Sequence, residues 1–243
     1  MHAQGPAYTS AQLHCARYAE TSHSDIETQT GPGALQATAE RAGVWSFRAR
    51  DSSGVLLEAW LDSLTLVRRT GDTEVRPDTD GLIGGRYRGV LDRTGRYAEI
   101  ARPFVPDEVA EVADLSAAGR DLLPRLPPRA LAPGETWADS GLSIRRLPDT
   151  VVAGRPLLRF ELEGRAETRE SVPRGDTVPV ALRQVTVERG AVYWSPVVGL
   201  VRRTREIEIE ASVPTGGRIR QPVRSRVTQR IELTRLPSQP GCR

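Results

Sequence analysis

The histidines and cysteines of this chain are the residues best suited to nucleophilic or metal chemistry, and they are few. His2, His14 and His23 are the only histidines, and Cys15 and Cys242 are the only cysteines. His14 and Cys15 are adjacent, so on a strand their side chains point to opposite faces, which is unsuitable for a Cys–His catalytic pair. The spacing of His14 and His23 matches no zinc-binding pattern. We therefore predict no catalytic residues, no metal ligands among these groups and no cofactor.

An acidic stretch, Pro77–Gly85 with the sequence PDTDGLIGG, begins like a calcium-binding loop. Asp78 and Asp80 stand two residues apart, and a glycine follows. An EF-hand needs an oxygen ligand at the fifth loop position and a bidentate glutamate at the twelfth, but here these positions hold Leu82 and Gly89. The mismatch favours an acidic turn that leads into a strand. A calcium site of a type other than the EF-hand is the alternative.

Motifs for the commoner enzyme classes are missing from the sequence. It has no G-x-S-x-G nucleophile elbow, no H-E-x-x-H and no glycine-rich phosphate loop. Carboxylates are plentiful, but no pair of them stands apart as an acid–base couple. We expect a protein that is not an enzyme, and an unrecognised hydrolase is the least favoured alternative.

The two cysteines lie at opposite ends of the chain. Cys15 falls in the first predicted strand and Cys242 is the penultimate residue, an arrangement that suits a disulfide between the C-terminal tail and that strand. In the chain-entropy model a loop this long would contribute about 4–5 kcal/mol. A disulfide would imply an oxidising compartment; the alternative is two unrelated thiols in a cytosolic protein.

The composition is that of an ordinary globular protein. Of the 243 residues, 38% are hydrophobic and 27% charged, and the formal net charge is +3. The chain has neither lysine nor asparagine, which a GC-rich genome explains, so its reliance on arginine indicates no nucleic-acid partner. No apolar run approaches the about 20 residues that span a bilayer. The start has no apolar core of a signal peptide, and His2-Ala3-Gln4 could be what remains of a cleavage site.

Most of the sequence alternates with period two between glycine-containing turns, which predicts antiparallel hairpins. The turns fall at Asp51–Gly54, Asp92–Gly95 and Pro196–Gly199. In the last hairpin, acidic residues share one face before the turn at Thr215–Gly216, and basic residues share the same face after it. Cross-strand pairing of the two rows would form a solvated charge ladder on one side of the sheet. The rows consist of Glu206, Glu208 and Glu210, and of Arg218, Arg220, Arg224, Arg226 and Arg230.

One region interrupts this β pattern. Pro106, followed by Asp107 and Glu108, is typical of a first helical turn, and Ser116 is a candidate cap for a second one. We therefore expect one or two short helices within residues 106–123. The proline-rich stretch that follows, residues 124–135, predicts an extended crossover that leads to a strand starting near Trp137.

The order of these segments, with the matching residues Gly134, Glu135 and Trp137, resembles a group of secreted bacterial β-rich proteins of unassigned function with a P…L..G..W signature. Those proteins are similar in plan to periplasmic lipoprotein-carrier and lipid-binding half-barrels. The resemblance spans about residues 11–233 and brings no catalytic residues with it. It implies a curved sheet wrapped over short helices, with an apolar ligand held between them.

We therefore predict a single mainly β domain over residues 11–236, an antiparallel half-barrel or open barrel of long hairpins, with a flexible segment before it (1–10) and a tail after it (237–243). Its expected role is a cell-envelope carrier, periplasmic or extracellular, for a lipid, an acyl chain or another apolar molecule. The alternative is a structural or interaction module of the cell surface that binds another envelope protein. Core packing is the competing role for the tryptophans among the candidate cavity residues, which are Trp45, Phe47, Trp60, Leu64, Val109, Val112, Trp137, Phe160 and Trp194.

Overall fold

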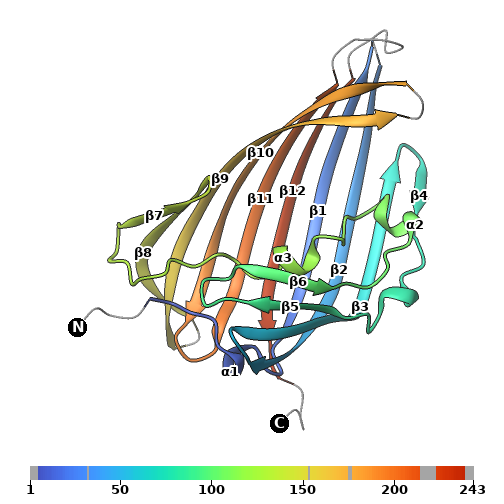
Figure 1. Ribbon diagram of the computed structural model, residues 1–243. Helices are drawn as coiled ribbons and strands as arrows, with labels where there is room; N and C mark the ends of the chain where they lie inside the picture. Colours follow the sequence, from blue (N-terminus) through green and yellow to red (C-terminus); the bar gives the residue numbers. More distant parts are fainter. Residues whose placement is uncertain (1–4, 32, 153, 175–176, 214–222, 239–243) are drawn as a thin grey trace.

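The computed structural model describes residues 5–31, 33–152, 154–174, 177–213 and 223–238. Its strands form one antiparallel sheet of twelve strands that curves strongly without closing into a barrel (Figure 1). This confirms the predicted fold class. The elements follow in the order α1 (Ser10–Leu13), β1 (Arg17–Thr30), β2 (Gly33–Asp51), β3 (Val55–Thr70), β4 (Thr73–Val75), η1 (Asp80–Leu82), β5 (Tyr87–Leu91), β6 (Tyr97–Ala101), α2 (Asp107–Ala110), α3 (Ala118–Asp121), β7 (Thr136–Asp139), β8 (Leu142–Val152), β9 (Arg155–Arg174), β10 (Thr177–Ser195), β11 (Gly199–Val213) and β12 (Val223–Leu236).

The sheet consists of two runs of hairpins that meet in its middle. Across it the strand order is β6-β5-β3-β2-β1-β12-β11-β10-β9-β8-β7, and the short β4 pairs with β3. The two runs join where β1 pairs with β12 over the whole length of β1. The first and last strands of the chain therefore lie side by side, and β6 and β7 form the two edges.

The predicted hairpin turns are confirmed. β2 and β3 flank the turn at Asp51–Gly54, β5 and β6 flank Asp92–Gly95, and β10 and β11 flank Pro196–Gly199. In the second turn the Asp92 carboxylate accepts the backbone N–H groups of Thr94 and Arg96, each at 2.8 Å. Such aspartate-to-backbone bonds form a tight turn without help from the rest of the sheet.

The predicted charge ladder lies on the convex face. Glu206 stands opposite Arg230 and Glu210 opposite Arg226 in the register of β11 and β12. The Arg230 and Arg226 guanidiniums each lie 3.6 Å from a carboxylate, of Glu206 and Glu208 respectively. These groups are half-exposed or exposed, so the ladder faces solvent. The predicted turn at Thr215–Gly216, with Arg218 and Arg220, lies outside the described residues.

Residues 102–135 connect β6 at one edge of the sheet to β7 at the other, so this segment has to cross a face of the sheet. It crosses the concave face, where α3 lies in front of the long central strands and α2 lies beside β3 and β4 (Figure 1). Buried leucine and valine side chains hold it there, and the expected short helices within residues 106–123 are confirmed. We call residues 106–123 the helical insert; its buried side chains include Val109, Leu115, Leu122 and Leu123.

The proline-rich stretch then runs along the same face to β7. The Tyr8 hydroxyl donates to the Pro124 carbonyl at 2.9 Å, and the Leu126 N–H donates to the Thr94 carbonyl at 2.8 Å. Gly95 has a φ of +87°, and an added Cβ there would lie 2.5 Å from the Pro124 carbonyl oxygen. Only glycine fits so close an approach in this backbone conformation. The crossover can therefore pack against this turn only because residue 95 is a glycine.

Two sequence-based placements are wrong. Cys15 does not lie in the first strand: it follows α1 with a φ of +59°, and β1 begins only at Arg17. Ser116 does not cap a helix, because α3 begins at Ala118 and the Ser116 hydroxyl instead donates to the Asp114 carboxylate at 2.5 Å. Cys242 lies outside the described residues, so its pairing with Cys15 stays a prediction.

The hydrophobic core fills the concave face at the end of the sheet next to α1. Aromatic side chains dominate it: the Tyr8 and Trp194 rings pack edge to face at 5.0 Å, and those of Tyr18 and Phe47 at 5.4 Å. The helical insert covers these rings with its leucines. One end of the half-barrel is therefore closed by packing, and the other end is left for a cavity.

Candidate ligand-binding site

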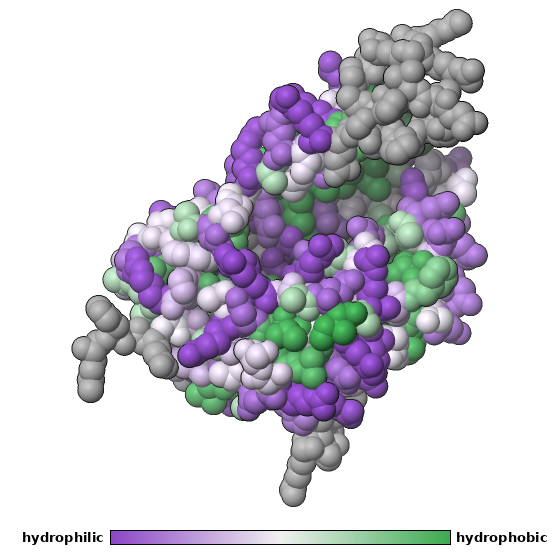
Figure 2. Space-filling view, in the orientation of Figure 1, coloured by the Kyte–Doolittle hydropathy of each residue, from purple (hydrophilic) through white to green (hydrophobic). Residues whose placement is uncertain are grey.

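A hollow opens on the concave face between the long strands and the helical insert (Figure 2). Its cavity volume is about 440 Å³, within the range of about 300–1,000 Å³ that is usual for small-molecule sites. Five neighbouring strands, β10, β11, β12, β1 and β2, form its floor, and the helical insert forms one wall. The hollow therefore lies where the two halves of the sheet meet.

Apolar side chains line the part of the floor farthest from the core. Ile209, Val227 and Ile26 stand opposite one another on β11, β12 and β1, because Val227 pairs with both of the others. Ile207 and Ile231 continue the apolar surface toward the core. Several of these side chains are only half-buried, so the floor offers apolar area that the other described residues do not cover fully.

A charged cluster stands beside this apolar floor, on β10 and β11. The Arg205 guanidinium binds both oxygens of the Glu188 carboxylate, with Nε–Oε1 at 2.8 Å and Nη2–Oε2 at 2.9 Å. Arg203 contributes a third contact, 3.3 Å from Nη2 to the same Oε1. The three residues alternate with outward-facing ones along their strands, so their placement on the concave face follows from the period of two.

The protonation of this cluster is fixed by its members. Burial opposes ionisation of Glu188, but the hydrogen bonds and positive charges of Arg205 and Arg203 outweigh it and hold the pKa of this carboxyl below its ordinary value. Burial, followed by repulsion from Arg205, lowers the pKa of Arg203 to about 10. At neutral pH the cluster therefore consists of two guanidinium cations and one carboxylate.

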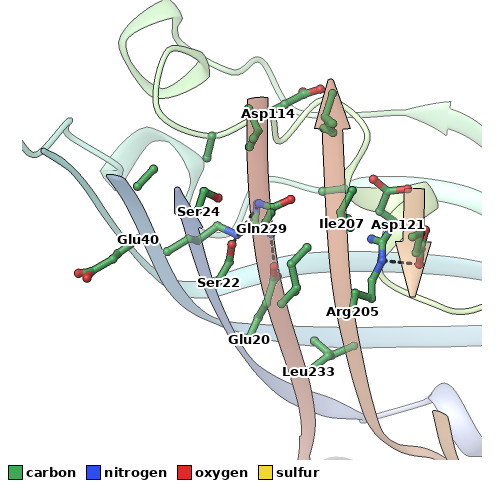
Figure 3. Close-up of a pocket in the computed structure, with 18 of the residues that line it drawn as sticks. Glu20, Ser22, Ser24, Glu40, Asp114, Asp121, Arg205, Ile207, Gln229 and Leu233 are labelled. Atoms are coloured by element: carbon green, nitrogen blue, oxygen red, sulfur yellow. Dashed lines mark hydrogen bonds and ion pairs between the residues drawn. The ribbon is translucent and has the colours of Figure 1, made fainter. Parts of the chain in front are cut away.

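A second charged group lies on β1 and β2. Arg41 forms an ion pair with Glu20, and the Trp45 indole N–H donates to the other oxygen of the same carboxylate. Glu20 is 5% exposed. Leu233 of β12 pairs with Glu20 on one side and with Arg203 on the other, and Figure 3 shows Glu20, Leu233 and Arg205 around this end of the site. The deep end of the cavity is thus flanked by charge on both sides of an apolar strand.

Arg203 also fastens the helical insert to the sheet. Its Nη1 donates to the backbone carbonyls of Asp121 and Leu122, at the end of α3. A guanidinium at a helix C-terminus satisfies carbonyls that the helix leaves unbonded and is favoured by the helix dipole. The position of the wall of the cavity therefore depends on a side chain from its floor.

The predicted cavity residues fall into three groups. Trp45 and Val112 line the cavity. Trp60 points to the opposite face, where its indole N–H donates to Asp62 at 2.9 Å and the Arg86 guanidinium lies 3.7 Å from its ring centroid. The others belong to the packed core or contact it: Phe47, Leu64, Val109, Phe160 and Trp194 are buried there, and Trp137 packs against it partly buried.

Glu20, Arg41, Glu188, Arg203 and Arg205 were absent from the sequence-based candidates. Their signal was present in β11, where Ile207 and Ile209 set the inward face and the same period of two places Arg205 and Arg203 on it. Charged residues that continue an apolar face are the feature to look for, because a buried charge needs a partner or a ligand.

No metal site is evident in the part of the chain that the structure describes. No group of three or more histidine, cysteine, aspartate or glutamate residues there could hold a metal ion. The Asp78 carboxylate accepts the Asp80 N–H at 2.9 Å and caps a local turn. The described residues also contain no helix that is both long and apolar enough to cross a membrane.

Comparisons with known proteins give a fold and no family. No protein-family model and no curated protein match this chain. Among solved structures it is similar to lipovitellin, in a structure concerned with lipid–protein interactions, with a TM-score of 0.52 and 14% identity. The match covers 93% of this chain and 25% of the lipovitellin chain. This chain therefore spans a quarter of that one, and the likeness is one of fold alone.

Two further matches are weaker. Neisserial surface protein A gives a TM-score of 0.27 at 10% identity over 90% of this chain and 97% of that one. A DUF1329 family protein from Desulfovibrio piger gives a TM-score of 0.18 at 12% identity over 94% of this chain and 87% of that one. Both scores are too low to establish a shared fold.

Proposed function

We propose that this protein holds a lipid, an acyl chain or another apolar small molecule in the hollow of its sheet, as a non-enzymatic carrier located in the periplasm or outside the cell. One observation carries the proposal: a cavity of about 440 Å³ opens beside half-buried isoleucine and valine side chains on an otherwise well-packed concave face. A filled core would have closed this space with side chains of the chain itself.

Burial of apolar surface in the hollow can supply a favourable free energy of binding. Covering apolar surface contributes about 0.8 kcal/mol for each buried methylene group. A chain of methylenes that lies on Ile209, Val227 and Ile26 would remove both its own surface and theirs from water. Affinity would therefore increase with the length of the ligand's chain.

The fold comparison also supports a lipid-binding role. The chain shares a curved-sheet fold with part of lipovitellin, a protein studied for its lipid–protein interactions. Folds host unrelated functions, so the support comes from the fold only together with the hollow.

Extraction of natively purified protein with organic solvent, followed by mass spectrometry, tests the proposal directly. We expect a lipid or acyl compound at a stoichiometry near one per chain. A neutral fluorescent probe, N-phenyl-1-naphthylamine, should bind the delipidated protein and be displaced by the extracted compound. Repeated extraction without any bound lipid, together with no probe binding, would contradict the proposal and favour an assembly role.

A matched pair of variants locates the site. Ile209→Gln places an amide on the apolar floor and should weaken probe binding about fivefold or more, the equivalent of about 1 kcal/mol of lost apolar burial. Glu210→Gln changes the next residue, whose side chain points to the convex face, and should leave binding unchanged. Equal effects of the two variants would place the probe outside the hollow.

A further inference from the structure

On the basis of the proposed function, we infer that the ligand is an amphiphile with an anionic head, a carboxylate or a phosphate monoester, and that Arg41 binds this head while the chain lies on the apolar floor. The inference deepens the proposal by naming the chemistry of the ligand. It rests on the contacts of Arg41, on the balance of charge in the deep part of the cavity and on the register of the floor.

Arg41 has an unused hydrogen-bond donor in the cavity. Its side chain is 15% exposed and forms one ion pair, from Nη2 to Glu20. Its Nε is buried and has no hydrogen-bond partner among the residues that the structure describes. Glu20 accepts from Arg41 Nη2 on one oxygen and from the Trp45 indole N–H on the other, and neither oxygen accepts a hydrogen bond from Arg41 Nε. A buried N–H without an acceptor is unfavourable, and an anionic oxygen from a ligand would satisfy it.

The charges in the deep part of the cavity favour an anion. Three guanidiniums, those of Arg41, Arg203 and Arg205, face two carboxylates, those of Glu20 and Glu188. These five side chains are all largely buried, so the excess of one positive charge is poorly screened. A carboxylate head would balance it with its single negative charge, and a phosphate monoester would supply that charge and up to about one more at neutral pH.

The other carboxylates along the cavity form different contacts or are exposed to solvent. The Asp114 carboxylate accepts the backbone N–H and hydroxyl of Ser116. Glu40 is half-exposed and pairs with Arg69 at 3.2 Å. Asp121 is exposed on the helical insert, and its charge raises the pKa of Arg203 and of Arg205 against the effect of burial. None of these three carboxylates bonds to the Arg41 Nε, so among the described residues that donor stays without an acceptor.

Arg41 is better placed to receive a ligand than the other two arginines. Arg205 uses both Nε and Nη2 on Glu188. Arg203 uses Nη1 on the backbone of the helical insert and Nη2 on Glu188, although its Nε, like that of Arg41, is buried without a partner. Arg203 and Arg205 therefore each bond to other parts of the protein through two nitrogens, whereas Arg41 does so through one.

The register connects Arg41 to the apolar floor. Arg41 pairs with Ser22, and Ser22 pairs with Ile231, so Ile231 lies two strands away, at about 10 Å from the usual strand spacing. Ile207 and the row of Ile209 and Val227 lie beyond it. A head at Arg41 therefore directs the chain across β1 onto the isoleucines of β12 and β11.

Binding of cis-parinaric acid and of its methyl ester to the delipidated full chain tests the inference, since the two probes share a chain and differ in charge. The wild type should bind the acid at least tenfold more tightly than the ester. Arg41→Gln should remove this difference by weakening the acid alone, and Arg41→Lys should retain part of it. Arg226→Gln, on the convex ladder, is the control and should change neither affinity.

The outcomes separate the two proposals. Equal affinity of the wild type for acid and ester would overturn the anionic head and leave the proposed function standing; this readout needs no variant to fold. Failure of both probes to bind would count against the proposed function itself. Dodecanoate and dodecyl phosphate should each displace the acid, whereas acetate and inorganic phosphate should not. Displacement by these small anions at equal concentration would indicate a simple anion site and overturn the inference.

Discussion

Arg96 and Asp139 form an ion pair of 2.8 Å that connects the two edges of the sheet. Arg96 immediately precedes the edge strand β6, and Asp139 ends the opposite edge strand β7. Arg125 of the proline-rich crossover binds the same carboxylate oxygen, also at 2.8 Å. The sheet is thus not closed by backbone hydrogen bonds, but one aspartate holds its two edges and the crossover together.

Asp139→Asn should loosen both edges, with a pH dependence that follows from the ion pair. Hydrogen bonds from Arg96, then from Ser140, hold the pKa of the Asp139 carboxyl below its ordinary value. Its contribution to stability is therefore complete above about pH 4, the usual aspartate range, and is lost as the pH falls through the depressed native value. The difference in urea midpoint between wild type and variant should shrink from pH 7 to pH 2.

Hydrogen exchange provides the spatial readout for the same variant at neutral pH. We expect faster exchange in β6 and β7 and unchanged exchange in β1 and β12. Asp51→Asn is the control, because Asp51 is an exposed aspartate at the end of β2. If both variants behaved alike at the edges, the ion pair would have no role in holding them.

Arg203→Met should detach the helical insert from the floor of the cavity. The substitution leaves the carbonyls of Asp121 and Leu122 without their donor, at a cost of about 1–3 kcal/mol in the free energy of unfolding. Exchange should accelerate over residues 117–123. Arg202→Met is the matched control on the convex face, where an exposed pair with Glu232 contributes at most about 1 kcal/mol. A loss no larger than that of the control would contradict the role of Arg203 as a fastener.

The sequence predicts this fold where the signal is local. The turn at Asp92–Gly95 and the alternation in Glu206–Val213 depend on neighbours along the chain, and both appear as predicted. The pairing of β1 with β12 depends on strands some two hundred residues apart, and no local pattern specifies it. Without that pairing, the crossing of residues 102–135 over the concave face could not be derived.

The candidate site was harder to predict, because period two tells which face a side chain takes and not whether that face is filled. Phe160 and Trp194 were sensible cavity candidates by residue type, but large aromatic rings pack best, and they close the core. The hollow is left where smaller or charged side chains, such as Ser22 and Arg41, take the same face. Polar or charged residues at positions that continue an apolar face of a strand are therefore the sequence signal for this hollow.

The convex ladder should contribute little to stability, in keeping with its exposure. A double-mutant cycle on Glu206→Ala and Arg230→Ala should give a coupling energy of about 0.2–1 kcal/mol that falls as salt is added. The two groups lie 3.6 Å apart, and their side chains are 48% exposed for Glu206 and 71% exposed for Arg230. A coupling well above this range, or one insensitive to salt, would show that the ladder is more than a solvated face.

Trp45 should report on the ligand, because it is the tryptophan that lines the cavity and donates to Glu20. Binding of dodecanoate should therefore change the intrinsic fluorescence of the protein. Trp45→Phe should abolish most of this change while retaining binding of the neutral probe. Trp194→Phe is the control, since Trp194 packs on Tyr8 in the closed core and should leave the change intact. A fluorescence change that followed Trp194 instead would place the ligand in the core end of the half-barrel, away from Arg41.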